Sequence, residues 1–212
     1  MSLSHEIPVA GVTGPSVQRG GLLVGQISHL VLVSCLVKHV TMSAPEVVGL
    51  VSSLGPAPWV TLAGWEDPCC WEDLGHVVVG LHGRKYQVVV ETQGTLWQEW
   101  LTYCDLVTYS LDPSSTAHIF SVAMLQKYHA RLGDRLSVDV IVSTDDDLDF
   151  AARVRRIVPK TRVSLSTAPA LNRAGTIAAY RWLVERVVRR PELRAAAILP
   201  RLDVLLGMEL GR

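Results

Sequence analysis

The sequence predicts an α/β fold in which about six mainly parallel strands form a partial (β/α) barrel or an open sheet within a single domain. Short runs of β-branched residues alternate with segments of helical periodicity, which is the pattern of βαβ units with right-handed crossovers. The chain has 212 residues, enough for one α/β domain with a sizeable core. Six strands are too few for a closed barrel of eight.

The expected strands are short, apolar and rich in β-branched residues, as buried parallel strands are. They cover Leu30–Cys35, Trp59–Leu62, Tyr86–Glu91, Leu106–Tyr109, Val138–Ser143 and Arg162–Leu165. Ligands of such folds bind where the strands end. The residues that follow these runs are therefore the first candidates for a site.

Helical patterns fall between most of these strands. They cover Ser43–Leu54, Glu72–Leu81, Leu96–Thr102, Asp145–Val158 and Gly175–Arg189. The first begins with Ser43 three residues before Glu46, the spacing of a capping box. The carboxylate run Asp145–Asp147 is interpreted as N-terminal capping that suits the helix dipole, with a cation site as the alternative.

The composition excludes several classes of protein. Hydrophobic residues make up 49% of the chain and charged residues 19%, so disorder is not expected. The 20 basic and 20 acidic residues cancel, which gives no support for nucleic-acid binding. The longest apolar stretch, Leu30–Val37, is far short of the ~20 residues that a membrane span needs, and no signal peptide is evident. Four scattered cysteines do not make a disulfide framework, so we expect a reduced, cytoplasmic protein.

Five stretches occur in the order in which one enzyme family carries similar motifs. They are GPSVQRGG (14–21), VTLAGWEDP (60–68), VETQGTLW (90–97), SLDPSS (110–115) and ILPRLDVLLG (198–207). They resemble the motifs GPTxQGEG, VTLTGGEP, ETQGT, SPKPPSS and LPQLHVLLWG. From about residue 8 to its C-terminus the chain thus resembles the 7-carboxy-7-deazaguanine synthases of the radical S-adenosylmethionine superfamily.

The resemblance implies a partial (β/α) barrel, usually in a homodimer, whose 4Fe-4S cluster binds S-adenosylmethionine and cleaves it reductively. In that family the radical rearranges 6-carboxy-tetrahydropterin, with help from magnesium, on the route to queuosine. The resemblance also places functional positions on this chain. The rim of the substrate pocket matches Gln18, Glu91, Thr92 and Ser110. The cofactor loop matches Gly64 and Glu66, and the first metal-binding cysteine matches Cys35.

The other residues that hold the family's cluster are missing. The family uses three cysteine thiolates in a CxxxCxxC arrangement. Here Cys35 is followed by Leu36–Met42, which contains no cysteine, and the next helical pattern begins almost at once. This indicates that the cluster-binding loop was deleted after Cys35, together with the aspartate–threonine pair that serves magnesium. We therefore predict no cofactor for this chain and regard Cys35 as a remnant metal ligand.

Other family positions have changed while the core positions remain apolar. Trp65 stands where the family has a second glycine, and Asp112 replaces the lysine of SPK. A lysine of the next strand is Asp139, and a glutamine further on is Ser166. Loss confined to the site indicates a fold that was retained after its chemistry was dropped.

Several alternatives stay open from the residues alone. Cys35 and Cys69 or Cys70 are expected at the ends of neighbouring strands, where a zinc ion is an alternative to plain buried thiols. The carboxylates Glu66-Asp67 and Glu72-Asp73 are interpreted as a solvated turn, with acid–base chemistry as the alternative. Trp65 and Trp71 lie around the altered cofactor loop. We expect them to fill the vacated pocket, the alternative being a partner surface.

Three functions follow from these interpretations. The leading hypothesis is a homologue that has lost radical chemistry and serves as a ligand-binding or regulatory pseudoenzyme. Its expected partners are a second copy of the chain, a purine-like or pterin-like small molecule, and a partner enzyme such as an intact synthase. The second hypothesis is an active 7-carboxy-7-deazaguanine synthase whose cluster is held in an atypical way. The third is a purely structural interaction protein.

Overall fold

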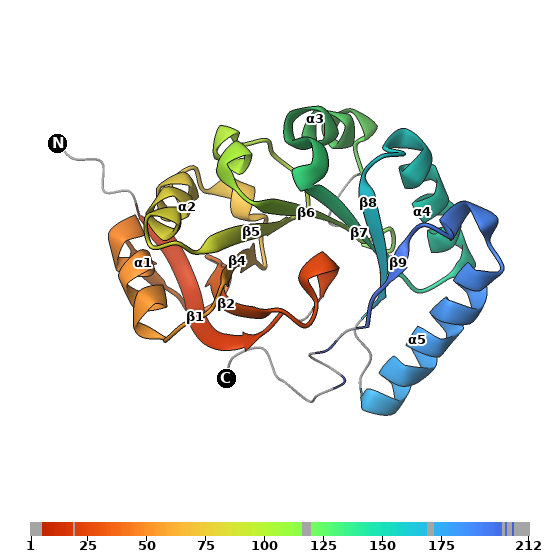
Figure 1. Ribbon diagram of the computed structural model, residues 1–212, viewed down its shortest axis with the longest axis horizontal. Coiled ribbons are helices and arrows are strands. Elements are labelled where there is room, and N and C mark those ends of the chain that lie inside the picture. Colours follow the sequence, from red (N-terminus) through yellow and green to blue (C-terminus); the bar gives the residue numbers. More distant parts are fainter. Residues whose placement is uncertain are drawn as a thin grey trace. The chain divides into compact units, whose positions relative to one another are not determined.

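The computed structural model describes residues 6–18, 20–115, 120–168 and 172–200 together with Leu202 and Leu205 (Figure 1). Arg19 lies outside the described residues, as does most of the predicted tail motif after Pro200. The described chain forms two compact units. The first comprises the described residues up to Val17 and Gln26–Val107, and the second comprises Gln18–Gly25 and the described residues from Thr108 onward.

The first unit is built on a mixed sheet in the strand order β3-β1-β2-β4-β5. These strands are β1 (Ile7–Val17), β2 (Ile27–Val33), β3 (Val40–Met42), β4 (Trp59–Gly64) and β5 (Gln87–Thr92). β2, β4 and β5 are parallel, whereas β1 pairs antiparallel with both β2 and β3. The carboxyl ends of the three parallel strands therefore lie along one edge of this sheet.

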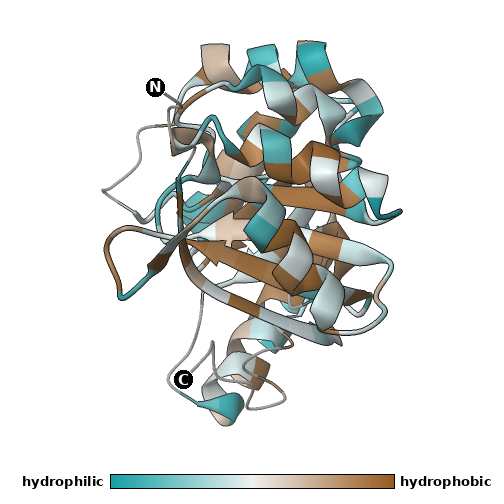
Figure 2. Cartoon of the chain, turned by 90° about the vertical axis from the view of Figure 1, so that its left-hand side faces the viewer, coloured by the Kyte–Doolittle hydropathy of each residue, from teal (hydrophilic) through white to brown (hydrophobic). Residues whose placement is uncertain are grey.

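Two helices pack in the first unit, α1 (Ala44–Ser53) and α2 (Leu74–Gly83), with the short 3₁₀ helices η2 (Pro68–Cys70) and η3 (Glu99–Tyr103). Strand and helix residues of aliphatic type form its core. Among those with no exposed surface are Val31, Val33, Val47, Val51, Val60, Leu62, Val77, Leu81, Val88 and Val90. Figure 2 shows strands made mainly of hydrophobic residues beside helices in which hydrophobic and hydrophilic residues alternate along the chain.

The predicted capping box at the start of α1 is confirmed. The Glu46 carboxylate accepts hydrogen bonds from the Ser43 backbone N–H (2.7 Å) and the Ser43 hydroxyl (2.6 Å). The hydrogen bonds from Ser43 lower the pKa of Glu46 below its ordinary value, since they favour the charged carboxylate.

The second unit contains the parallel strands β7 (Leu136–Val142), β8 (Arg162–Thr167) and β9 (Ala197–Ile198) in that order. β6 (Leu106–Leu111) begins in the first unit and ends in the second. The helices of the second unit are α3 (Val122–Leu132), α4 (Asp145–Ile157) and α5 (Arg173–Val188), with the 3₁₀ helices η1 (Gly21–Leu23), η4 (Gly133–Arg135) and η5 (Pro191–Leu193). In the described part of the chain, no helix is both long and apolar enough to cross a membrane.

The carboxylate run Asp145–Asp147 forms the first turn of α4 and caps that helix, as predicted. Asp147 accepts hydrogen bonds from the backbone N–H groups of Ser143 and Thr144, both at 2.9 Å. Asp145 instead pairs with Arg190 at 3.1 Å. No cation is needed to explain these carboxylates.

The α/β class and the mainly parallel strands are confirmed, but the number of strands was too low. The described residues form nine strands, because β1, β3 and β9 were not predicted. β1 contains Gly14-Pro15 and an irregular register near it, so its sequence resembles a loop. Helix α3 was also missed, and the predicted helix Leu96–Thr102 is the 3₁₀ helix η3. The partial barrel stays a prediction.

Candidate functional site

The carboxyl ends of β2, β4 and β5 bring several of the predicted site residues together. Ser34 and Cys35 follow β2 directly, and Glu66 and Asp67 follow β4 by two and three residues. The last pair of the β2–β4 ladder is Val33 with Gly64, so these segments leave the sheet side by side. This is the edge at which parallel α/β sheets bind ligands.

The Glu66 carboxylate holds the segment that follows β2. Its Oε1 atom accepts hydrogen bonds from the Cys35 backbone N–H (3.0 Å) and from the Cys35 thiol (2.9 Å). Its Oε2 atom accepts a short hydrogen bond from the buried Ser34 hydroxyl. Glu66 was predicted to bind a cofactor, but in this structure both of its oxygens are used within the protein.

These contacts oppose formation of a Cys35 thiolate. The hydrogen bond to Glu66 raises the pKa of the Cys35 thiol above its ordinary value, and partial desolvation and the charge of Glu66 act in the same direction. Desolvation alone raises the pKa of Glu66, but the hydrogen bonds from Cys35 and Ser34 outweigh it and lower the pKa. Desolvation, followed by the charges of Asp67 and Glu66, raises the pKa of Cys70. Metals bind the thiolate form, so this environment disfavours metal binding.

Gly64 is required by the close approach of β2 and β4. A Cβ atom at this position would lie 2.5 Å from both the Val33 and the Glu66 carbonyl oxygens. The glycine at this position therefore has a steric cause within the protein. The neighbouring Trp65 is 49% exposed, so its indole is not buried as the predicted pocket filling requires.

Asp67 links the end of β4 to the end of β5. Only 3% of its surface is exposed. It accepts hydrogen bonds from the Cys69 backbone N–H (3.0 Å), the Thr92 hydroxyl (2.7 Å), the Thr95 N–H (2.9 Å) and the Thr95 hydroxyl (2.7 Å). The prediction that Asp67 belongs to a solvated turn is therefore wrong. Asp67-Pro68 at a strand end is a capping signal, and Asp67 is the N-cap of η2.

The two threonines of the ETQGT motif thus have a structural task in the first unit. Thr92 is 1% exposed, and its hydroxyl also accepts a hydrogen bond from the Gly94 N–H (3.0 Å). Glu91 and Thr92 are successive strand residues, so their side chains point to opposite faces of the sheet.

The cysteines do not fit a cluster that needs three thiolates. Cys35 and Cys70 are exposed, whereas Cys69 and Cys104 are buried. The Cys69 sulfur contacts the Thr92 hydroxyl at 3.3 Å, and Cys104 precedes β6 and so lies away from the carboxyl ends of the strands. Among the described residues, which include all four cysteines, no group of three or more His, Cys, Asp or Glu side chains is arranged to hold a metal ion.

The other two predicted rim residues, Gln18 and Ser110, belong to the second unit. One face of its strands is polar. The buried Asp139 carboxylate accepts hydrogen bonds from the Ser164 (2.6 Å) and Ser166 (2.8 Å) hydroxyls. On the same face, the Thr108 and Ser137 hydroxyls lie 3.1 Å apart.

Ser110 lies two residues after Thr108 and therefore points to this polar face as well. Gln18 is 8% exposed and precedes η1, which contacts β7 and β8. From the sequence, Asp139 was identified only as an acidic residue in place of a family lysine. Its position between two strand serines was not predicted, although alternating polar residues in β7 and β8 are the available signal.

Comparison with known proteins identifies relatives that match this chain over nearly their whole length. The chain is 25% identical to the 7-carboxy-7-deazaguanine synthase of Bacillus cereus over an alignment of 230 positions, covering 95% of this chain and 96% of that protein. It is 27% identical to the enzyme of that name from Bacillus subtilis over 237 positions, covering 96% and 97%. No family model matches the chain.

Solved structures of Streptococcus suis SuiB share the fold. The complex with the precursor peptide SuiA matches with a TM-score of 0.55 at 10% identity, covering 81% of this chain and 47% of SuiB. The complex with S-adenosylmethionine matches with a TM-score of 0.51 at 10% identity, covering 74% and 42%. The chain thus spans less than half the length of SuiB, and this likeness concerns the fold alone. The full-length sequence matches carry the relationship, and they show that the chain is a relative of the 7-carboxy-7-deazaguanine synthases.

Proposed function

We propose that this chain is a ligand-binding or regulatory protein that has kept the fold of its relatives without their radical chemistry. One observation carries the proposal. The Cys35 thiol, at the predicted first metal-binding position, donates a hydrogen bond to the Glu66 carboxylate, while Cys69 is buried against Thr92. A 4Fe-4S cluster requires three converging thiolates, and this donor set does not supply them.

The polar face of the second unit supports a ligand with N–H donors. A carboxylate flanked by hydroxyl groups accepts hydrogen bonds well but repels anions. Asp139 therefore suits the amino-pyrimidinone edge that purine-like and pterin-like molecules share. A regulatory role toward an intact synthase, and a homodimer, are parts of the same proposal.

The first test is the metal content of the full chain after anaerobic reconstitution with iron and sulfide. We expect a colourless protein with far less than one iron per chain. Roughly four irons per chain, with a visible absorption band, would instead support an active enzyme with atypical ligation. If Cys35→Ser abolished that iron, the cluster would be assigned to this site.

The second test is thermal stabilisation by 7-deazaguanine and by pterin. A ligand whose free concentration is 100 times its Kd stabilises the folded state by about 2.7 kcal/mol. For a chain of this size that raises the melting temperature by about 5–10 °C. We expect Asp139→Asn to remove the shift and Asp146→Asn, at an exposed position of α4, to retain it. No shift with either ligand would favour the purely structural interaction protein.

A further inference from the structure

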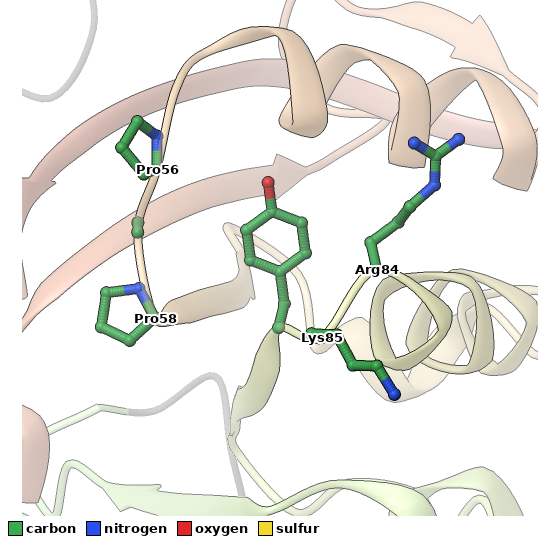
Figure 3. Close-up of a pocket in the computed structure, with 6 residues that line it drawn as sticks. Pro56, Pro58, Arg84 and Lys85 are labelled. Atoms are coloured by element: carbon green, nitrogen blue, oxygen red, sulfur yellow. The ribbon is translucent and has the colours of Figure 1, made fainter.

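A hollow lies at the edge of the first unit's sheet opposite the candidate site, where β4 and β5 begin. It is a shallow hollow of about 360 Å³, open to solvent and lined by the two connections that precede these strands. One wall is Pro56, Ala57 and Pro58, and the other is Arg84, Lys85 and Tyr86. Figure 3 shows Pro56 and Pro58 on one side of the hollow and Arg84 and Lys85 on the other. The volume is in the range of small-molecule sites.

Both walls are held in place by the protein. The imidazole of His29, which has no exposed surface, hydrogen-bonds through Nε2 to the Gly55 carbonyl at 3.0 Å and meets the Tyr86 ring edge-on at 5.8 Å between centroids. The Gln87 N–H donates a 2.9 Å hydrogen bond to the Pro58 carbonyl, which joins the two connections directly. The hollow is therefore preorganised, which lowers the entropic cost of binding.

The charge of the hollow is positive. Arg84 and Lys85 are exposed, and within the described residues neither side chain takes part in a hydrogen bond or an ion pair. Helices α1 and α2 end at this edge, and each C-terminus contributes about half a negative charge. Two such ends offset about one of the two full positive charges. The carboxylate of Asp105, which precedes β6, is hydrogen-bonded to the His82 ring (2.9 Å) and to the Val88 N–H (2.7 Å), so it does not pair with Arg84 or Lys85.

Lys85 occupies a backbone conformation that favours glycine. Its φ is +69°, and it is the only described non-glycine residue with positive φ. The Lys85 and Tyr86 N–H groups cap α2 through the His82 carbonyl (2.9 Å) and the Leu81 carbonyl (3.2 Å) in a Schellman arrangement. Left-handed backbone is unfavourable for residues with a Cβ. A lysine at this position therefore indicates a task for its side chain.

We propose that this hollow binds a small organic phosphate. The phosphate lies against the Arg84 guanidinium, whose fork matches phosphate oxygens. Lys85, whose side chain points away from that of Arg84 in Figure 3, adds positive charge to the same wall. The flat, apolar part of the ligand lies between the proline wall and the Tyr86 ring. This site is separate from the carboxyl edge of the strands, so it holds whether or not the proposed function does.

The test is isothermal titration of the full chain with AMP, adenosine and inorganic phosphate at low ionic strength, because exposed charges are screened by salt. We expect AMP to bind at least about tenfold more tightly than adenosine or phosphate alone. Arg84→Gln should weaken AMP binding by about tenfold, the loss that one charge-assisted hydrogen bond represents. Arg156→Gln, at an exposed position of α4, is the matched control and should bind AMP normally.

Lys85→Gly separates binding from folding. Glycine relieves the backbone strain, so this variant should melt at a higher temperature than the natural chain and yet bind AMP more weakly. A purely structural lysine would give the first effect without the second. The proposal is overturned if the natural chain binds none of the three probes at millimolar concentration, if adenosine binds as tightly as AMP, or if Arg84→Gln binds AMP as the control does.

Discussion

The thiol of Cys35 and the carboxylate of Glu66 share a hydrogen bond of 2.9 Å between Sγ and Oε1. The two residues follow neighbouring parallel strands, and Glu66 also accepts the Cys35 N–H. The carboxylate thereby fixes the backbone after β2 and keeps the thiol protonated. Cys35, which the resemblance predicts to match the first metal-binding cysteine of the 7-carboxy-7-deazaguanine synthases, is here part of an internal contact.

Glu66→Gln should make Cys35 more reactive. Removing the negative charge lowers the pKa of the thiol, and each unit of pKa changes the thiolate fraction about tenfold at a pH below the pKa. The rate of iodoacetamide alkylation near neutral pH should therefore rise severalfold. Cys70 is also exposed, so the comparison uses a Cys70→Ser background. An unchanged or slower rate would show that Glu66 does not control this thiol.

Asp67→Asn should destabilise the chain by about 3 kcal/mol. The carboxylate accepts hydrogen bonds through both oxygens, whereas the amide nitrogen of asparagine is a donor and would face N–H or O–H donors without accepting from them. Four hydrogen bonds from Cys69, Thr92 and Thr95 depend on this group. Urea unfolding followed by circular dichroism measures the loss. Glu72→Gln, an exposed carboxylate of the same segment, is the control and should change stability by less than about 0.5 kcal/mol. Equal effects of the two substitutions would refute the structural role of Asp67.

The sequence was most informative where one local rule decides the structure. Ser43 and Glu46 predicted the start of α1, and the run after Thr144 predicted the cap of α4, because capping involves residues three positions apart. Buried parallel strands were found from their β-branched runs. β1 was missed because it contains Gly14-Pro15, which indicates a turn when read locally, whereas pairing with β2 and β3 stabilises a strand.

The candidate site was predicted only in part. The resemblance placed Cys35, Gly64 and Glu66 at neighbouring strand ends, and the structure brings them together. It did not reveal that Glu66 holds Cys35 or that Asp67 is buried, because both facts depend on contacts between residues about 25–30 positions apart. Such contacts depend on strand order and register, which no short motif encodes.

Ser43→Ala should make the stability of α1 depend less on pH. The folded-state pKa of Glu46 is depressed by its hydrogen bonds from Ser43. A depressed carboxyl pKa contributes stability above the unfolded value, and that contribution is lost as the pH falls through the folded value. In the variant the pKa of Glu46 should rise toward its ordinary value. The difference in stability between the two proteins should therefore be larger near neutral pH than in acid.

Two measurements check the Ser43 prediction. Carbon-detected NMR titration reports the pKa of Glu46 directly, and urea unfolding at about pH 7 and about pH 3 reports the linked stability. A Glu46 pKa that did not move in Ser43→Ala would contradict the assigned cause. Ser53→Ala, at the other end of the same helix, is the control, since the Ser53 hydroxyl donates its hydrogen bond to the Leu50 carbonyl and not to Glu46.

Two glycine substitutions should act in opposite directions. An alanine Cβ at Gly64 would lie 2.5 Å from two carbonyl oxygens, and neither belongs to a flexible side chain that can yield. Gly64→Ala should therefore destabilise the chain by about 1–3 kcal/mol, as overpacking does. Gly49 lies in α1, where nothing described is within 4 Å of an added Cβ, so Gly49→Ala should stabilise the helix by up to about 1 kcal/mol. Urea midpoints that shift in the same direction for both variants would show that close approach of β2 and β4 is not what requires Gly64. Cys35 follows β2 and Glu66 follows β4, so a displacement of these strands should weaken the contact between the two side chains. Iodoacetamide should therefore alkylate Cys35 faster in Gly64→Ala than in Gly49→Ala.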